Sequence, residues 1–487
     1  MNGSIGCAVA AANNGYPGMV ATADTTSPEV EAYLRQRTGL SASTLGWPWL
    51  RRVLSYRWTW TSVAVVTLAT VSIFVLITDI MRTRTAQDGS KIPGLNADAL
   101  MMAANRAWPT MVFWIVCFIL VDRYKPQRFL VWLLALTWGA CVAVTGSYYI
   151  NSWAETKMAV VDPMSGASAV RVAVFVAPFV EEATKACVIF LIVALDRNRF
   201  ASRISGAIVG GLAGAGFAFT ENIVYYARVI VYGSYTSGAG DVMEQLDEIV
   251  LLRGVLTCFG HPMFTLATGV GIGFAVTSRS KVVRVMAPVS GYLLAAFLHM
   301  FFNWWVSVLP SEMIITILMI GVWPIVAVVA IRVTVSSIRQ GRTVADRLTD
   351  YVAMGWLPSN YPSAMSRLRT RVWTILMSLW HAKPVLTWLL QVRATELALL
   401  REAITRGTID RGGLWREYEL IDEIARLGRR GGLADGRGMR PYWPWNSRRS
   451  RGVIASARRV AATPRQNAVS EPVLKYSVVD AGWKPPA

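Results

Sequence analysis

The sequence is short of charge and of histidine. Of its 487 residues, 16% are Asp, Glu, Lys or Arg, three are His, and 54% are apolar. A soluble globular domain carries about 25% charged residues, so this composition excludes a chain that is soluble throughout. It is typical of an integral membrane protein built from long apolar segments.

Several metal-binding and targeting signatures are also absent. The five cysteines form no CxxC pair or other ligand spacing, so neither a disulfide framework nor a thiolate zinc site is indicated. The HExxH motif does not occur, which excludes a conventional zincin. Residues 1–33 contain no Lys or Arg and therefore lack the basic start of a signal peptide. We expect residues 1–45 to form a disordered lead rich in Gly, Ala and Thr.

The chain does contain eight apolar runs that are long enough to cross a membrane. They cover approximately residues 58–80, 108–121, 129–150, 170–195, 204–231, 251–276, 285–309 and 313–331. The sequence therefore predicts an all-α fold, a polytopic membrane helix bundle with about eight transmembrane helices, over residues 46–333. We expect a multi-pass integral protein of the cell membrane.

The charges of the connecting loops predict the orientation of the bundle, because cytoplasmic loops are enriched in Lys and Arg. The loops after the second, fourth and sixth runs each hold three basic residues, whereas residues 233–248 hold four acidic residues and no basic one. Both termini are therefore predicted to be cytoplasmic. Residues 81–107 do not follow this pattern, since they should be external yet hold four basic residues.

Beyond the apolar runs the chain becomes basic. Residues 333–487 hold 25 of the 49 Lys and Arg residues against 12 acidic ones. We expect a cytoplasmic or interfacial helical region over 334–432 and a disordered basic tail over 433–487, with anionic lipid headgroups as the partner of this charge. Residues 372–392 are apolar enough for a ninth span, but polar residues at their centre favour an interfacial or paired helix. No nucleic-acid-binding module is recognised, so no nucleic acid partner is expected.

Four consecutive apolar runs carry polar residues that lipid should reject. These residues are Glu181 and Glu182, Glu221, His261, and His299 with Asn303. Counted from the predicted external end of its run, each site lies ten or eleven residues deep, which is about 15 Å along a helix. Ionisable residues within spanning helices face the bundle interior and mark functional sites. We therefore expect these side chains to form one buried cluster, closer to the external face.

Helix periodicity indicates which of these groups act together. Lys185 follows Glu181 and Glu182 by four and three residues, so it lies within reach of both carboxylates. Its charge would keep one carboxylate ionised while the desolvated neighbour favours its protonated form, an arrangement suited to general acid–base work. His299 and Asn303 share one helix face, which fits an oxyanion clamp or a pair of metal ligands.

The sequence leaves the question of a metal open. Glu181, Glu221, His261 and His299 are candidate ligands for a divalent ion such as Zn²⁺, and Mn²⁺ or Fe²⁺ would also suit a Glu/His set. No residue pattern here distinguishes such a site from a metal-free glutamate. The cofactor is therefore left undecided.

Small residues and prolines predict close helix contacts and helix breaks near these residues. Gly206, Gly210 and Gly214 recur every four residues and form a face that lets a neighbouring helix approach closely. Pro178 precedes Glu181 by three residues and removes one helix hydrogen bond there, and Pro262 directly follows His261. We expect backbone irregularity beside the polar cluster.

Taken in order along the chain, these residues carry a family resemblance. Glu181-Glu182-Ala-Thr-Lys185 is an EExxK motif, Phe217 with Glu221 and Asn222 forms FxxxEN, His261 follows, and His299 with Asn303 forms HxxxN. The ordered set, over residues 170–309, resembles the PrsW-type intramembrane proteases, which belong to the superfamily of type II CAAX prenyl proteases. One departure concerns the second motif, where the CAAX-type relatives carry His and this chain has Glu221.

The resemblance implies an intramembrane endopeptidase, glutamic or metal-dependent, in a bacterial plasma membrane. Its substrate would be a single-pass membrane protein, such as an anti-sigma factor, that is cut from the extracytoplasmic side. Glu181, with Glu182, would activate water, and His299 and Asn303 would stabilise the oxyanion. Lys185, Phe217 and Asn222 would support these groups.

Two other functions also fit buried Glu and His residues. An ion- or proton-coupled transporter places such residues at mid-membrane, although the inverted repeat that many transporters contain is not visible in this sequence. A non-catalytic membrane scaffold would keep the fold and tolerate loss of the acids. Cleavage of a single-pass protein would distinguish a protease from both alternatives.

Overall fold

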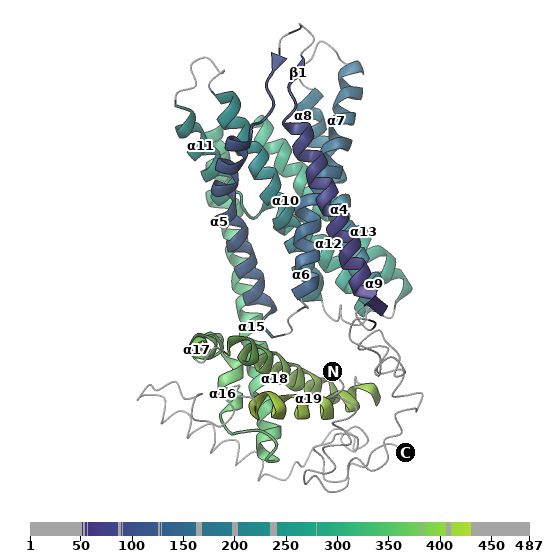
Figure 1. Cartoon of the computed structure of the whole chain (residues 1–487), viewed down its shortest axis with the longest axis vertical. Coiled ribbons are helices and arrows are strands. Elements are labelled where there is room, and N and C mark those ends of the chain that lie inside the picture. The colour runs from purple at the N-terminus through teal and green to yellow at the C-terminus, as the bar shows by residue number, and fades with distance from the viewer. Residues whose placement is uncertain are drawn as a thin grey trace. The chain divides into compact units, whose positions relative to one another are not determined.

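The computed structural model describes residues 51, 54–55, 57–85, 89, 91–124, 127, 129–161, 168–196, 203–233, 241–278, 280–380, 383–405 and 411–429. The described chain is helical except for one short antiparallel hairpin, in which β1 (Arg84–Thr85) pairs with β2 (Lys91–Ile92) (Figure 1). The predicted all-α class is confirmed. The expected disordered lead and basic tail lie outside the described residues.

The chain divides into two compact units. The first, called the bundle unit here, comprises Arg57–Asp122 and Gln127–Val329. The second, called the C-terminal unit, comprises Met1–Tyr56, Arg123–Pro126 and Ala330–Ala487.

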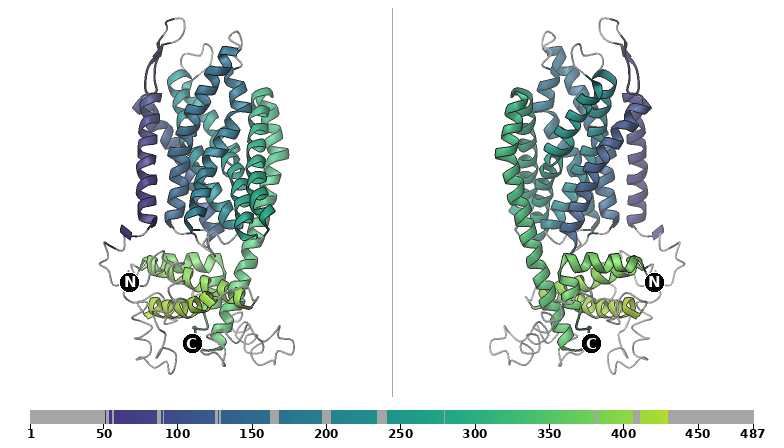
Figure 2. Two further views of the ribbon diagram at one scale, coloured as in Figure 1. Left: turned by 90° about the vertical axis from the view of Figure 1, so that its right-hand side faces the viewer. Right: turned by 90° about the vertical axis from the view of Figure 1, so that its left-hand side faces the viewer.

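The bundle unit consists of long helices that run side by side (Figures 1 and 2). Its helical elements are α4 (Arg57–Ile80), α5 (Ala97–Asp122), α6 (Phe129–Thr137), the π-helix η2 (Trp138–Ala143), α7 (Val144–Val161), α8 (Ser168–Phe175), α9 (Ala177–Asp196), α10 (Arg203–Tyr232), α11 (Val242–Val250), the π-helix η4 (Leu251–Leu256), α12 (Gly260–Thr277), α13 (Lys281–Val308), α14 (Ser311–Ile317), the π-helix η5 (Leu318–Val322) and the start of α15 (Trp323–Ala353). Among the described residues, seven helical stretches are long and apolar enough to cross a membrane. The prediction was about eight; α9, which carries Glu181, Glu182 and Lys185, is not among the seven.

Several helices extend past the apolar runs that predicted them. α5 begins at Ala97 rather than at 108, α7 continues to Val161 rather than to 150, and α15 continues to Ala353 rather than to 331. Hydropathy marks only the part of a helix that lipid can surround, whereas the backbone hydrogen bonds continue through polar residues at either end. The runs therefore predict the positions of these helices correctly but make the helices too short.

The fourth predicted run is broken within the membrane segment. α8 ends at Phe175 and α9 begins at Ala177, with Pro178 in the first turn of α9. Proline has no N–H to donate, so a carbonyl in the preceding turn needs another partner. Helix α13 contacts the backbone on both sides of the break: Asn303 Nδ2 donates to the Ala173 carbonyl at 2.8 Å, and the Tyr292 hydroxyl donates to the Phe179 carbonyl at 3.0 Å. The break is thus held in a defined geometry.

The predicted glycine face of α10 packs against α12. A Cβ atom added at Gly210 would fall against the Thr265 carbonyl, and one added at Gly214 would fall against the His261 carbonyl. Only glycine permits these two backbones to approach so closely. The contact fixes the backbone of His261 at the start of α12 and therefore sets where its imidazole lies.

Replacing Gly214 by Ala should consequently disturb both stability and the site. We expect a destabilisation of about 1–3 kcal/mol, the usual cost of overpacking a tight contact, measured as a lower thermal unfolding temperature in detergent. Gly146→Ala in α7 is the matched control, because the nearest atom to its new Cβ would be the Thr184 methyl at 3.7 Å, an ordinary contact. Equal behaviour of the two variants would contradict the proposed role of the glycine face.

The predicted orientation can be tested independently of the site. Because of the loop charges, a reporter fused after Ser237 should be active outside the cell, and one fused after Ser470 inside it. Alkaline phosphatase and green fluorescent protein fusions provide the two readouts. An intracellular Ser237 or an extracellular Ser470 would overturn the orientation and the depth argument that depends on it.

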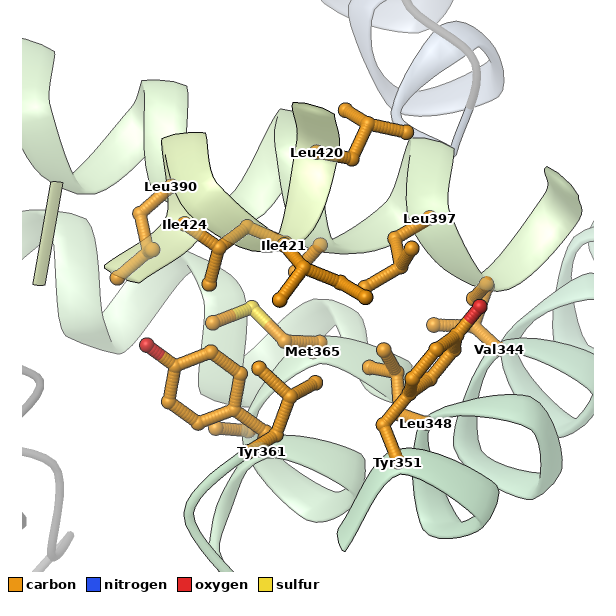
Figure 3. Close-up of a cluster of buried hydrophobic side chains, with 14 of the residues drawn as sticks. Val344, Leu348, Tyr351, Tyr361, Met365, Leu390, Leu397, Leu420, Ile421 and Ile424 are labelled. Atoms are coloured by element: carbon orange, nitrogen blue, oxygen red, sulfur yellow. The ribbon is translucent and has the colours of Figure 1, made fainter. Parts of the chain in front are cut away.

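The C-terminal unit is a small helical assembly with its own core. It contains most of α15, then α16 (Tyr361–Ser366), α17 (Leu368–Leu379), α18 (Pro384–Thr405) and α19 (Arg411–Arg429). Apolar side chains from all of these helices except α17 meet in one cluster (Figure 3): Val344, Leu348, Tyr351, Tyr361, Met365, Leu390, Leu397, Leu420, Ile421 and Ile424. The apolar stretch 372–392 belongs to two helices, since α17 ends at Leu379 and α18 starts at Pro384, and neither is among the seven stretches of the described chain that are long and apolar enough to cross a membrane.

Candidate active site

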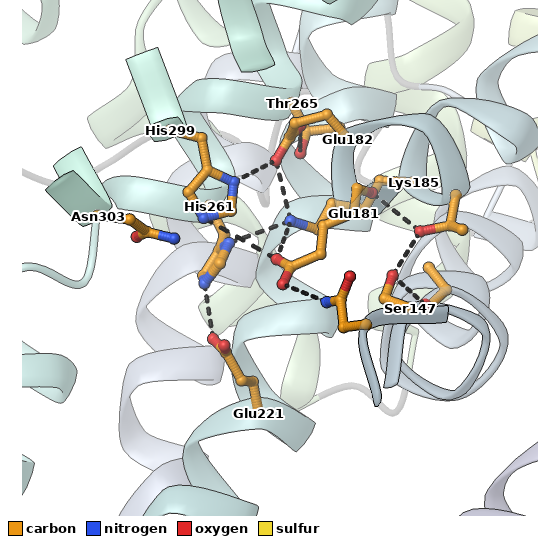
Figure 4. Close-up of polar contacts among 12 residues, drawn as sticks. Ser147, Glu181, Glu182, Lys185, Glu221, His261, Thr265, His299 and Asn303 are labelled. Carbon is orange, nitrogen blue, oxygen red and sulfur yellow. Dashed lines mark hydrogen bonds and ion pairs between the residues drawn. The ribbon is translucent and has the colours of Figure 1, made fainter. Parts of the chain in front are cut away.

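Polar side chains from α9, α10, α12 and α13 meet inside the bundle unit, as the sequence predicts (Figure 4). The cluster comprises Glu181, Glu182 and Lys185 of α9, Glu221 of α10, His261 and Thr265 of α12, and His299 of α13. Both carboxylates of the EExxK motif contact Lys185, whose Nζ lies 2.9 Å from Glu182 Oε1 and 3.5 Å from Glu181 Oε2. The predicted reach of this lysine is confirmed.

Glu182 is surrounded by donors from three helices. Its Oε1 accepts a hydrogen bond from Lys185 at 2.9 Å and lies 3.3 Å from His299 Nδ1, and its Oε2 accepts from the Thr265 hydroxyl at 2.8 Å. The side chain is completely buried. Because each of its oxygens already has a donor from the protein, Glu182 holds its neighbours in place.

Glu181 differs sharply from its neighbour. Its Oε2 is buried and has no hydrogen-bond partner among the described residues, and the nearest nitrogens are Lys185 Nζ at 3.5 Å and His299 Nε2 at 3.9 Å. Its Oε1 accepts from Asn151 Nδ2 at a long 3.5 Å. A buried carboxylate oxygen without a donor is costly and needs a specific explanation. Glu181 is therefore the acid that is free to bind water or a cation.

The two histidines are arranged in the same way. His261 Nε2 lies 2.7 Å from Glu221 Oε2, and His299 Nδ1 lies 3.3 Å from Glu182 Oε1, so each imidazole has a carboxylate behind one of its nitrogens. The two rings are perpendicular, with centroids 5.0 Å apart. Metal-binding histidines usually donate their second ring N–H to a carboxylate, which fixes the tautomer and the ring orientation.

A divalent ion would fit between these groups. Glu181, His261 and His299 each offer a ligand atom, and these atoms lie within 4.8 Å of one another. Two histidines and one glutamate form the protein ligands of several catalytic zinc sites, in which the fourth position holds water. The partnerless Glu181 oxygen and the carboxylate-backed imidazoles suit this use. Of the four predicted ligand candidates, Glu221 is not part of the group and instead lies behind His261.

Lys185 already brings a positive charge to this position. Its Nζ lies 3.1 Å from His261 Nδ1, the nitrogen that faces away from Glu221, and 3.8 Å from the centroid of the Phe217 ring. The ammonium donates into the lone pair that a metal would use. A bound ion would therefore require Lys185 to withdraw toward the two carboxylates.

Several residues of the site were missed by the sequence analysis. Arg253 of η4 donates to Glu221 Oε2 at 2.6 Å and to Asn222 Oδ1 at 2.9 Å, so it fixes the carboxylate behind His261. It lies in the sixth apolar run and carried the same signal as the others, a charge that lipid rejects. Asn151 lay one residue past the predicted end of the third run. No sequence signal marked Thr265 or Phe264, whose ring stacks on His299.

Two predicted residues have other contacts than expected. Asn222 accepts a hydrogen bond from Arg253, which also donates to Glu221, so its support of the site is indirect. Asn303 directs its amide to the Ala173 carbonyl at the break between α8 and α9. Its predicted role as an oxyanion donor stays a prediction, and the structure adds a second function for it, which is to hold that break.

Comparison with known proteins adds one finding. Residues 125–331 match a family described as PrsW family intramembrane metalloprotease. No curated protein and no solved structure matches the chain. The matched range contains every residue of the cluster described above.

Proposed function

We propose that this chain, whose residues 125–331 form a domain of the PrsW family of intramembrane metalloproteases, cleaves single-pass membrane proteins at the cluster around Glu181. The domain makes the chain a multi-pass membrane hydrolase of the peptidase class. The observation that supports this site most strongly is the difference between its two adjacent carboxylates. Glu181 has a buried oxygen without a donor, whereas the protein satisfies both oxygens of Glu182.

In this proposal Glu181, His261 and His299 hold a divalent ion such as Zn²⁺. The ion would polarise the scissile carbonyl and activate water for attack. Glu221 and Glu182 accept hydrogen bonds from the remaining ring nitrogens of His261 and His299, so that both lone pairs face the centre of the site.

Other residues of the chain keep these groups in place. Arg253 anchors Glu221, and the glycine face of α10 anchors the backbone of His261. Lys185 supplies a fixed positive charge beside the acids, which favours a tetrahedral intermediate that carries negative charge. Preorganised charges of this kind are most effective where water is excluded.

The substrate class follows from the burial of the site. A peptide bond that reaches it must enter the bundle from the membrane, and a single-pass protein, such as an anti-sigma factor in a bacterial plasma membrane, meets this requirement. The polar cluster lies within spanning helices, and the loop charges predict that it is closer to the external face. The family match favours this function over the transporter and the scaffold.

The proposal can be tested with the purified full-length protein in proteoliposomes that contain single-pass reporter substrates. We expect cleavage that a chelator abolishes and that one added divalent ion restores, with metal content followed by mass spectrometry. Cleavage that survives removal of all metal would overturn the metal step and favour a metal-free glutamate. Absence of cleavage for every single-pass reporter would contradict the proposed substrate class.

A further inference from the structure

Helix α17 of the C-terminal unit buries three polar side chains and exposes most of its large apolar ones. The inward side consists of Arg371, Thr374 and Ser378, which are all buried. The outward side, called the α17 apolar face here, consists of Leu368, Val372, Trp373, Leu376, Leu379 and the following Trp380, all exposed. A helix on a soluble surface shows the opposite pattern.

Specific contacts hold the polar side inward. Arg371 is 5% exposed, and its guanidinium donates to the Thr395 hydroxyl at 2.7 Å and to the Arg123 carbonyl at 2.9 Å. Gln391 Nε2 of α18 donates to the Arg371 carbonyl at 2.9 Å and to the Thr374 hydroxyl at 2.7 Å. These bonds fix the rotation of α17 about its axis. Hydrogen bonds within the protein therefore keep the apolar face of α17 directed outward.

The apolar face continues onto the first turns of α18. Val385 is 66% exposed and Trp388 is 44% exposed, while Trp380, between the two helices, is 84% exposed. Monomeric soluble proteins seldom display so many large apolar side chains together. Tryptophan is the residue that concentrates at the boundary between lipid and water, because its ring is apolar and its N–H is polar.

The charges around this face have a single sign. Residues 367–395 contain five Lys or Arg residues and no Asp or Glu. Arg367 at the start of α17 and Lys383 before α18 are both exposed. An apolar, Trp-containing face bordered by basic residues is the pattern of a helix that lies in a membrane surface. A protein partner would have to match both the apolar face and the exposed basic residues beside it, Arg367, Arg369 and Lys383.

We propose that α17 and the start of α18 lie in the headgroup layer of a membrane leaflet that contains anionic lipid, with the α17 apolar face toward the acyl chains. The buried Arg371 network is what makes this possible, because it satisfies the polar side of α17 within the protein. The surface anchors the C-terminal unit and is separate from the proteolytic cluster. The proposal does not depend on the proposed peptidase mechanism.

Photo-crosslinking in nanodiscs tests this assignment on the full-length chain. The probe is a phospholipid with a diazirine in its upper acyl chain, in neutral phosphatidylcholine discs and in discs with added phosphatidylglycerol. We expect lipid adducts on the peptide that contains residues 368–380, and several-fold more of them in the anionic discs. Mass spectrometry of the digested protein measures both.

Two variants make the test specific. The double variant Arg367→Gln with Lys383→Gln should lose most of the increase caused by phosphatidylglycerol, whereas Arg342→Gln on the exposed side of α15 should keep it. Size-exclusion chromatography checks that both proteins remain folded. Absence of adducts on α17, or equal labelling in neutral and anionic discs, would each overturn the proposal.

Discussion

Replacing Glu181 by Gln should lower the rate of peptide-bond hydrolysis by about 10²–10⁴-fold, because water is then activated neither by an ion held at Glu181, as proposed, nor by the carboxylate itself in a metal-free site. An amide keeps the shape of the side chain but neither accepts that proton nor binds a divalent ion as a carboxylate does. The fold should survive, because Glu181 Oε2 accepts no hydrogen bond from the described residues and Lys185 retains its 2.9 Å contact with Glu182.

Single-turnover cleavage of a reporter in proteoliposomes gives the rate, and thermal unfolding in detergent gives the stability. Glu155→Gln is the matched control, since this exposed acid of α7 lies outside the cluster and should leave both quantities unchanged. Glu182→Gln should instead reduce stability, by about 1–3 kcal/mol, because it disturbs a buried group with three donors. A Glu181→Gln protein that cleaves at the wild-type rate would show that Glu181 is not the acting carboxylate.

Replacing Lys185 by Met should strengthen binding of a divalent ion at least about tenfold, which corresponds to 1.4 kcal/mol. The substitution removes a like charge and frees His261 Nδ1, which the ammonium now contacts at 3.1 Å. Without metal the same variant should be destabilised by about 3–5 kcal/mol, because two buried carboxylates lose their common counter-charge. Removal of the lysine therefore makes the fold dependent on metal.

Competition with a chromogenic chelator measures the affinity, and unfolding with and without chelator measures the dependence. Lys281→Met, at the exposed start of α13, removes the same charge away from the cluster and should change neither. Unchanged or weaker metal binding by the Lys185→Met protein would show that the ammonium does not compete for the site. The role of the Lys185 ammonium would then be limited to stabilising the charges of Glu181 and Glu182.

The convergence of the polar residues was predictable from the sequence, because lipid penalises every alternative. Glu221, His261 and His299 lie on different helices, yet each must face the bundle interior, and the loop charges set their predicted depths. The close approach of another helix to α10 was predictable too, since Gly210 and Gly214 repeat with the helix period, and the structure identifies that helix as α12. The cost of exposing polar side chains to lipid, together with helix periodicity, is sufficient to predict these two features.

The different contacts of the Glu181 and Glu182 carboxylates were not predictable. Adjacent residues on a helix point about 100° apart, and only the neighbouring helices decide which carboxylate meets Thr265 and His299. The contact of Asn303 with the Ala173 carbonyl depends on a helix break whose position Pro178 suggests but whose partner it does not. Such pairings depend on how the helices are rotated and staggered, which a single sequence does not contain.

Which side of α17 is buried could likewise not be predicted from the sequence. Its apolar composition suggested an interfacial helix, but the inward side is set by Gln391 and Thr395 of another helix. A pattern of apolar residues shows that a helix has two faces. It does not say which face the rest of the protein covers.

The position of Lys185 has a consequence for how the protein is made. Its ammonium contacts both acids of α9 and the Nδ1 atom of His261, so it offsets part of their charge, and we expect the helices to associate in the bilayer without an ion. If an ion binds as proposed, synthesis and membrane insertion would not depend on the supply of metal in the cell. We then expect cells grown without that metal to accumulate folded protein that gains activity when the ion is added later.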